Sequence, residues 1–264
     1  MTSLFEPLDG GRVLPTGHSR GPWDPDALHG GPVAMLVAGA VEALPTDHPM
    51  TVSRLTIELE RPVPLVPLTV RAEVTRPGRK VRVVDAEVHT DDGTRIVRAR
   101  ALQIRTTEVD LDSHASAVEL APPPTGPEGL PAAPPSWRGP DEAFHLTAAE
   151  HRYVSGSFER LGPVAVWISV VIDVLPGQRP SPLQQVAGAG DFGNGVSAIV
   201  PFDEYLFINP DLTIHLDRPP TDDWVLLHAR THLDRAGTGL AESELFDRRG
   251  HLGRSLQSLL LEAR

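Results

Sequence analysis

One segment of this sequence occurs twice. Residues Leu55–Pro62 return as Leu212–Pro219, 157 positions later, with six of the eight residues identical. The same offset aligns the turn glycines Gly93 and Gly250. A repeat that keeps its register over about forty residues indicates two copies of one supersecondary unit, each able to form half of the molecule. Positions at which the two copies differ are therefore candidates for function.

A proline-rich segment separates the two copies. Eight of the twenty residues from 121 to 140 are proline, which excludes a packed helix or a central strand there. Such a segment is typical of an extended linker. We therefore predict an N-terminal half over 1–111, a proline-rich linker over 112–141 and a C-terminal half over 142–264.

Each half contains one strong helix candidate. In the first half, Pro32 opens an apolar run over 33–44 in which Glu42 is the only charged residue. Proline suits the first turn of a helix, and a helix that is apolar nearly all round is usually buried on all sides. In the second half, Ser181 is a good cap for a predicted helix over 183–191.

Segments of alternating polarity accompany these helices. Leu55, Ile57 and Leu59 alternate with polar residues, as in a strand with one buried face. The predicted strands cover 52–62, 68–76, 80–90, 95–106, 150–158, 163–173, 205–218, 224–234, 239–247 and 251–262. An apolar helix enclosed by a curved antiparallel sheet is the hot-dog arrangement. The sequence thus predicts an α+β fold, a double hot-dog of two tandem repeats.

Composition and charge argue against several classes of protein. The chain has no cysteine, which excludes disulfides and thiolate metal sites. Its net charge of −11 disfavours nucleic-acid binding, because acidic surfaces repel phosphates. The sequence has no apolar run of about 18 residues that would predict a membrane span, and its first residues do not read as a secretory signal. We therefore expect a cytoplasmic protein without a membrane span.

Four short motifs add a more specific indication. They are Trp23 followed by His29-Gly30-Gly31, the segment Pro77–Lys80, the segment Pro210–Thr213 and the closing segment Gly253–Leu259. In this order and with this repeat, the chain resembles the double hot-dog acyl-CoA thioesterases of the thioesterase II type, especially their actinobacterial-type relatives. The resemblance covers nearly the whole chain except the linker.

The resemblance implies a catalytic set in the C-terminal half. That family holds its hydrolytic water with an aspartate on the second helix, a threonine on the next strand and a glutamine on the last strand. The matching residues here are Asp191, Thr213 and Gln257. A carboxylate can act as a general base, which typically contributes about 10²- to 10⁴-fold in rate. A hydroxyl and a carboxamide can fix the position of the water through donor and acceptor pairs.

Substrate contacts are expected at two further places. His29, beside Gly30, could be catalytic, although a lone histidine in this position more often caps a helix or lines a pocket. The free N–H groups of Gly30 and Gly31 at the helix start are candidate donors to the thioester carbonyl. Arg79 and Lys80 belong to the densest basic cluster, which could bind the phosphates of coenzyme A. A solvated hairpin end is the simpler interpretation of these two cations.

The two copies differ at the predicted catalytic positions. Thr56 matches Thr213, and Arg100 or its neighbour stands at the position of Gln257. No aspartate in 28–44 corresponds to Asp191. The first half therefore lacks the full set, and we expect it to form a wall of the pocket.

The leading hypothesis is an acyl-CoA thioesterase of fatty acid metabolism that acts on acyl-CoA or acyl-pantetheine, needs no cofactor and forms a homo-oligomer. One alternative is a hot-dog enoyl-CoA hydratase, which usually needs an aspartate and a histidine close together, and no histidine flanks Asp191 in the sequence. Another is a non-catalytic acyl-thioester-binding module. His228 and His232 have the spacing of a helical metal pair, but on a strand they lie about 13 Å apart, so no metal site is expected.

Overall fold

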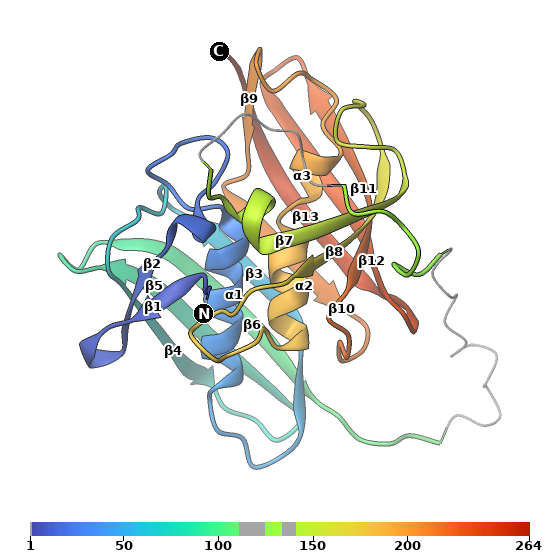
Figure 1. Ribbon diagram of the computed structural model, residues 1–264. Helices are drawn as coiled ribbons and strands as arrows, with labels where there is room; N and C mark the ends of the chain where they lie inside the picture. The colour runs from blue at the N-terminus through green and yellow to red at the C-terminus, as the bar shows by residue number, and fades with distance from the viewer. Residues whose placement is uncertain (1, 111–124, 134–140) are drawn as a thin grey trace.

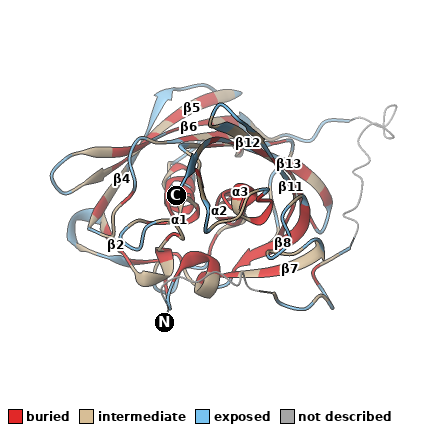
Figure 2. Ribbon diagram, turned by 90° about the horizontal axis from the view of Figure 1, so that it is seen from above, coloured by how far each residue is buried: buried red, intermediate tan, exposed pale blue. Residues whose placement is uncertain are grey.

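The fold is built on one long antiparallel sheet. The computed structural model describes residues 2–110, 125–133 and 141–264. Within them, thirteen strands form a sheet that curves around two adjacent helices (Figures 1 and 2). Each helix is covered by the strands of its own half, so the predicted double hot-dog is confirmed.

The N-terminal half contributes six strands and one long helix. They are β1 (Phe5–Pro7), β2 (Arg12–Pro15), α1 (Gly30–Glu42), β3 (Met50–Leu59), β4 (Leu68–Arg76), β5 (Val81–Thr90) and β6 (Arg95–Arg105). Two short turns of helix, η1 (Asp9–Gly11) and η2 (Gly17–Ser19), connect the first segments.

The C-terminal half contributes seven strands. They are β7 (Ala149–Ser155), β8 (Val164–Val170), β9 (Tyr205–Ile208), β10 (Asp211–Leu216), β11 (Val225–Asp234), β12 (Thr238–Asp247) and β13 (Gly250–Ala263). Its helical segments are η4 (Phe144–Ala148), α2 (Pro182–Gly190) and the short α3 (Gly193–Val196).

The two copies of the repeat lie side by side at the centre of the sheet. Strand β3 pairs with β10 in antiparallel register, and Thr56 lies directly opposite Thr213. The strand order is β1-β2-β4-β5-β6-β3-β10-β13-β12-β11-β8-β7, and β9 also pairs with β13. The duplicated segments therefore join the halves into one sheet, and the buried apolar residues of both halves form a common core.

Helices α1 and α2 pack against each other in opposite directions. Glycines permit the close approach, since a Cβ atom on Gly39 would lie 2.5 Å from Gln184 and one on Gly188 would lie 2.7 Å from Met35. At one end of the pair, Ser181 at the start of α2 donates to Glu42 at the end of α1. At the other end, the start of α1 meets the end of α2. This second meeting point brings residues from both halves together.

The predicted strand 205–218 is interrupted in the structure. Strand β9 ends at Ile208 and β10 begins at Asp211, with Asn209 and Pro210 between them. Proline has no N–H to donate to a sheet, so it is rarely found inside a central strand. The other predicted strands agree with the structure to within a few residues. Asn209 therefore lies outside the two strands, and the alternation of side chains along a strand does not determine where its side chain points.

Part of the proline-rich segment is packed on the C-terminal half. The Trp167 indole N–H donates to the Thr125 carbonyl oxygen, and Arg152 donates to the carbonyl oxygen of Pro127. Residues 112–124 and 134–140 of the predicted linker lie outside the described residues. The boundaries at 111 and 142 remain predictions.

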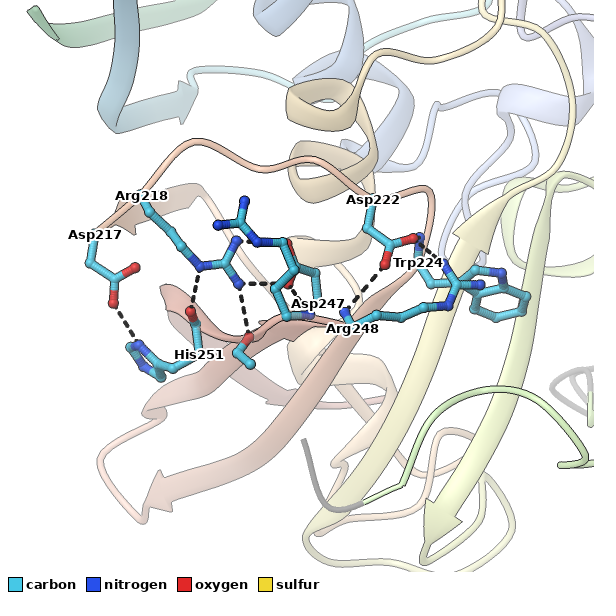
Figure 3. Close-up of polar contacts among 9 residues, drawn as sticks. Asp217, Arg218, Asp222, Trp224, Asp247, Arg248 and His251 are labelled. Carbon is cyan, nitrogen blue, oxygen red and sulfur yellow. Dashed lines mark hydrogen bonds and ion pairs between the residues drawn. The ribbon is translucent and has the colours of Figure 1, made fainter. Parts of the chain in front are cut away.

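A network of polar side chains lies at the β12–β13 turn of the C-terminal half (Figure 3). Arg218, which follows β10, makes a two-pronged ion pair with Asp247 at 2.7 and 2.5 Å. It also donates to the carbonyl oxygens of Gly250 and His251. Asp247 is only 1% exposed, so this guanidinium neutralises a buried carboxylate and fixes the β12–β13 turn.

No helix in the described part of the chain is long and apolar enough to span a membrane.

Candidate active site

Asp191 is the centre of a buried polar group at the end of α2. Its side chain is 3% exposed. One carboxylate oxygen, Oδ1, accepts from the Nδ2 of Asn209 at 2.9 Å and lies 3.3 Å from the Nε2 of Gln257. The other oxygen, Oδ2, lies 2.8 Å from the Nδ1 of His29 at the start of α1. The group therefore unites the two halves of the molecule around one carboxylate.

Local sequence explains why Asp191 stands there. Helix α2 starts with a capping box, in which Ser181 and Gln184 satisfy each other's backbone N–H groups. It ends at Gly190, with Asp191 as its C-cap. Opposite, Gly30 leaves room for the carboxylate, because a Cβ atom at that position would lie 2.7 and 2.8 Å from the two Asp191 oxygens. Only glycine fits here without displacing the acid.

Gln257 holds Asp191 through the main chain as well as through the carboxylate. Its Nε2 also donates to the main-chain carbonyl of Asp191 at 3.1 Å, and its Oε1 accepts from the backbone N–H of Asn194 at 3.0 Å. Gly193 permits this approach, since a Cβ atom there would lie 2.8 Å from the Gln257 Oε1. The predicted pairing of Asp191 with Gln257 in space is therefore observed.

Thr213 does not join this group. Its neighbours Leu212 and Ile214 are buried in the core, and side chains alternate between the two faces of a strand. Thr213 consequently lies on the outer face of the sheet, where its Oγ1 is 3.5 Å from that of Thr56. The expectation that Thr213 belongs with Asp191 is corrected by the geometry, since alternation places it on the wrong face.

Asn209 occupies the place that was expected for Thr213. It lies in the interruption between β9 and β10, and its Nδ2 contacts both the Asp191 carboxylate and the carbonyl oxygen of Asp211. Sequence reasoning missed this residue because it treated 205–218 as one strand. The available signal was Pro210, which cannot continue a central strand and therefore marks Asn209 as a non-strand position.

A cavity of about 440 Å³ opens beside the polar group. Apolar and aromatic side chains form most of its wall, among them Trp23, Phe158, Phe192, Phe202, Leu206 and Ile208. The rings of Trp23 and Phe202 stack at 5.4 Å between centroids, and those of Phe158 and Phe202 at 5.3 Å. His29, Gly30, Asp191 and Asn209 form a polar patch on the same wall. The cavity thus combines an apolar chamber with a few convergent polar groups, which is typical of a ligand site.

Comparison with known proteins identifies the family of this chain. Residues 19–104 match the family model of the acyl-CoA thioesterase N-terminal domain, and residues 120–261 match that of the C-terminal domain. The chain belongs to the acyl-CoA thioesterase family. Its members are thioester hydrolases with hot-dog folds. A search of curated proteins found no match.

Solved structures show the same fold as this acyl-CoA thioesterase family member. A hot-dog protein from Alicyclobacillus acidocaldarius has a TM-score of 0.70 at 16% identity, covering 97% of this chain and 94% of its own. The acyl-CoA thioesterase II of Mycobacterium marinum has a TM-score of 0.65 at 16% identity, covering 98% of this chain and 95% of its own. At these identities the likeness establishes the fold alone.

Not all of the predicted substrate-binding residues of this family member lie at the cavity. His29 and Gly30 line it, whereas Gly31 packs against Phe144, and its N–H lies 3.0 Å from the His29 ring. Arg79 and Lys80 lie in the turn between β4 and β5. Sheet pairing puts that turn beside the start of β3, whereas the cavity adjoins the end of β3. Arg79 and Lys80 therefore do not lie at the cavity of their own chain.

The register of the strands explains how the halves of this family member differ. Gln257 lies opposite Ala241, and the position 157 residues before Ala241 is Val84. Val84 lies opposite Ala101. Ala101, a neighbour of Arg100, is therefore the first-half counterpart of Gln257. A methyl group cannot hold a carboxylate, so the first half carries no equivalent amide.

Two more buried histidines surround the site. His145 lines the cavity, and His151 packs edge-on against Phe192 at 4.9 Å. Burial, followed by the nearby charge of His29, lowers the pKa of each to about 3. Both rings are thus neutral at physiological pH. Within the described residues, no three histidine, aspartate or glutamate side chains are placed to hold a metal ion.

Proposed function

We propose that this protein hydrolyses acyl thioesters at the Asp191 site, giving a free acid and a thiol. The observation that carries the proposal is a buried carboxylate, held by Asn209, Gln257 and His29, at the wall of an apolar cavity. The two family matches supply the reaction class. The hydrolytic water would bind at this polar patch. Asn209 and Gln257 would keep the carboxylate in place.

The cavity wall suits the acyl group of such a substrate. Transfer of a methylene group from water into an apolar site is worth about 0.8 kcal/mol. The wall of Trp23, Phe158 and Phe202 offers such surroundings next to the polar patch. In the bound substrate, the thioester carbonyl would face Asp191 and His29, and the acyl chain would lie along the aromatic wall.

Arg61 is our candidate contact for the phosphates of coenzyme A. It lines the cavity and is exposed. Its counterpart in the second copy is Arg218, whose guanidinium is occupied by the buried Asp247. At the first-half position of Asp247 the sequence has Thr90, which carries no charge. Arg61 therefore meets no carboxylate that corresponds to Asp247, and its guanidinium is available to the substrate. A guanidinium binds phosphate well.

A panel of acyl-CoA substrates, followed with a thiol reagent, tests the hydrolysis. Wild-type protein should release thiol from at least one substrate, and Asp191→Asn should lower the turnover at least tenfold. Arg61→Ala should raise KM for acyl-CoA but leave KM for an acyl-pantetheine without the nucleotide unchanged. Undiminished turnover in Asp191→Asn would remove this carboxylate from the reaction.

An enoyl-CoA hydratase is the second candidate. The observation in its favour is the 2.8 Å contact between His29 and Asp191, which supplies the acid–imidazole pair that the sequence alone did not reveal. Loss of the enone absorbance of crotonyl-CoA, without thiol release, would establish hydration in place of hydrolysis. Binding of acyl-CoA with neither reaction would indicate a non-catalytic binding module.

Assembly and location are part of the same proposal. We propose a homo-oligomer that acts in fatty acid metabolism in the cytoplasm. Leu256 and Leu260 are 36% and 42% exposed on the outer face of β13, where a second copy could cover them. Light scattering on the purified protein should give a multiple of the 28.5 kDa chain mass. A monomer at micromolar concentration would contradict the assembly.

A further inference from the structure

The tautomer of His29 follows from its contacts. Its Nδ1 lies 2.8 Å from the Asp191 Oδ2 and 3.0 Å from the backbone N–H of Gly31. One ring nitrogen cannot donate to the first and accept from the second at the same time. A charge-assisted hydrogen bond is about twice as strong as a neutral one, and a bare nitrogen facing a carboxylate would be repelled. Nδ1 therefore carries the proton and donates it to Asp191, which leaves Nε2 unprotonated in the neutral ring.

The carboxylate itself has little capacity left for a water molecule. Oδ1 faces the amide groups of Asn209 and Gln257, and Oδ2 faces His29. Gly30 packs against the same two oxygens, and the Asp191 side chain is 3% exposed. By contrast, the His29 side chain is 10% exposed and lines the cavity. The part of this group that is more accessible from the cavity is therefore the imidazole.

We propose that the Nε2 of His29 is the general base of the reaction and that Asp191 is its positioning residue. This inference rests on the proposed hydrolysis. Nε2 takes one proton from water as the water oxygen bonds to the thioester carbonyl carbon. The C–S bond then breaks, and the same proton passes to the leaving sulfur, giving the free thiol. The remaining product is the carboxylic acid, which loses its own proton to solvent.

The surroundings of His29 suit this role. Its ring packs at 5.1 Å from the ring of Phe144 and 4.8 Å from that of Phe192, which fixes its orientation. The titratable groups that face it are Asp191 from α2, His145 from η4 and His151 from β7. The two histidines are neutral, and among the described residues that face His29, Asp191 is the one group of opposite charge. An imidazolium formed at His29 is therefore stabilised by its partner and not opposed by its other neighbours.

Replacement of His29 by asparagine gives the sharpest test. The asparagine amide can donate to Asp191 from near the Nδ1 position and is a good helix cap, but it has no basic nitrogen at the Nε2 position. We expect His29→Asn to lower kcat about 100-fold or more, with KM for acyl-CoA within about threefold of wild type. His151→Phe is the matched control, since His151 is a neighbouring, more deeply buried histidine that does not line the cavity. Its kcat should stay within about twofold.

The pH profile gives an independent readout. Removal of a general base changes how kcat/KM depends on pH. The pH dependence of kcat/KM in His29→Asn should therefore differ in shape from that of the wild type, whereas His151→Phe should keep the wild-type shape. A His29→Asn protein that folds and turns over within about threefold of wild type overturns the proposal, as does a pH profile of the same shape in His29→Asn and wild type. If the wild type releases no thiol from any substrate, the proposed hydrolysis itself fails, which is a distinguishable outcome.

Discussion

A single added methyl group at Gly30 should disable the site. In Gly30→Ala, the new Cβ atom would lie 2.7 Å from the Asp191 Oδ2 and 2.8 Å from Oδ1, whereas ordinary contact begins near 3.4 Å. The carboxylate must therefore withdraw by roughly 0.7 Å, the difference between 2.7 and 3.4 Å. Its contacts to His29 and Asn209, now 2.8 and 2.9 Å, would then lengthen toward the limit of hydrogen bonding. Displacement of a catalytic group by about 1 Å can cost about 100-fold in rate.

The assay compares kcat for Gly30→Ala with kcat for Gly195→Ala. Gly195 also lies on the cavity wall, but a Cβ atom there would meet nothing within 4 Å. We expect a loss of about 100-fold for the first variant and less than about threefold for the second, with both proteins folded by circular dichroism. Equal activity of Gly30→Ala and wild type would refute the reasoning, because the carboxylate could then not depend on this packing.

Three further predictions concern the remaining parts of the molecule. Thr213→Val should leave turnover within about twofold of wild type in the thiol-release assay, because Thr213 lies on the outer face of the sheet. Arg218→Met should lower the free energy of unfolding in urea by about 3–5 kcal/mol, because it leaves Asp247 as an unpaired buried charge. Burial holds the pKa of His145 and His151 near 3, below the value of about 6.5 in an unfolded chain. Unfolded protein therefore binds more protons between pH 6.5 and 3, so the stability that is complete above pH 6.5 should decline as the pH falls, by up to about 1.4 kcal/mol per pH unit for each histidine. In urea denaturation from pH 7 to 5, His151→Phe should show a shallower decline, and an unchanged slope would contradict this assignment.

Local patterns in the sequence were sufficient for most of the fold. The repeat identified the two halves, and apolar runs identified α1 and α2, because helix periodicity and capping are properties of short segments. The position of Thr213 on the outer face can also be predicted from the sequence, since Leu212 and Ile214 flank it in an alternating strand. The alternation of the strand decides the face on which Thr213 lies, whereas the residue type at a family position does not.

The contact between His29 and Asp191 could not be read from the sequence. The two residues are 162 positions apart, and neither stands in a motif that refers to the other. They meet because α1 and α2 run in opposite directions, so the N-cap residue of α1 reaches the C-cap residue of α2. The free N–H group at the start of α1 makes Gly30 a candidate oxyanion donor, and its position against the carboxylate shows that it also makes room for Asp191. The packing of α1 against α2 determines both the contact between His29 and Asp191 and the position of Gly30.

The duplication itself explains why such a site needs two different halves. In the antiparallel pair of helices, an N-terminus from one half always meets a C-terminus from the other, so each of the two meeting points combines residues of both copies. At one, Ser181 and Glu42 satisfy each other and no cavity residue is involved. At the other, Gln257 stands where the first half has Ala101, and this amide and that of Asn209 hold Asp191. A histidine cap on the opposite helix then completes the group. Differences between the two copies are thus sufficient to place this polar group at one of the two junctions and not at the other.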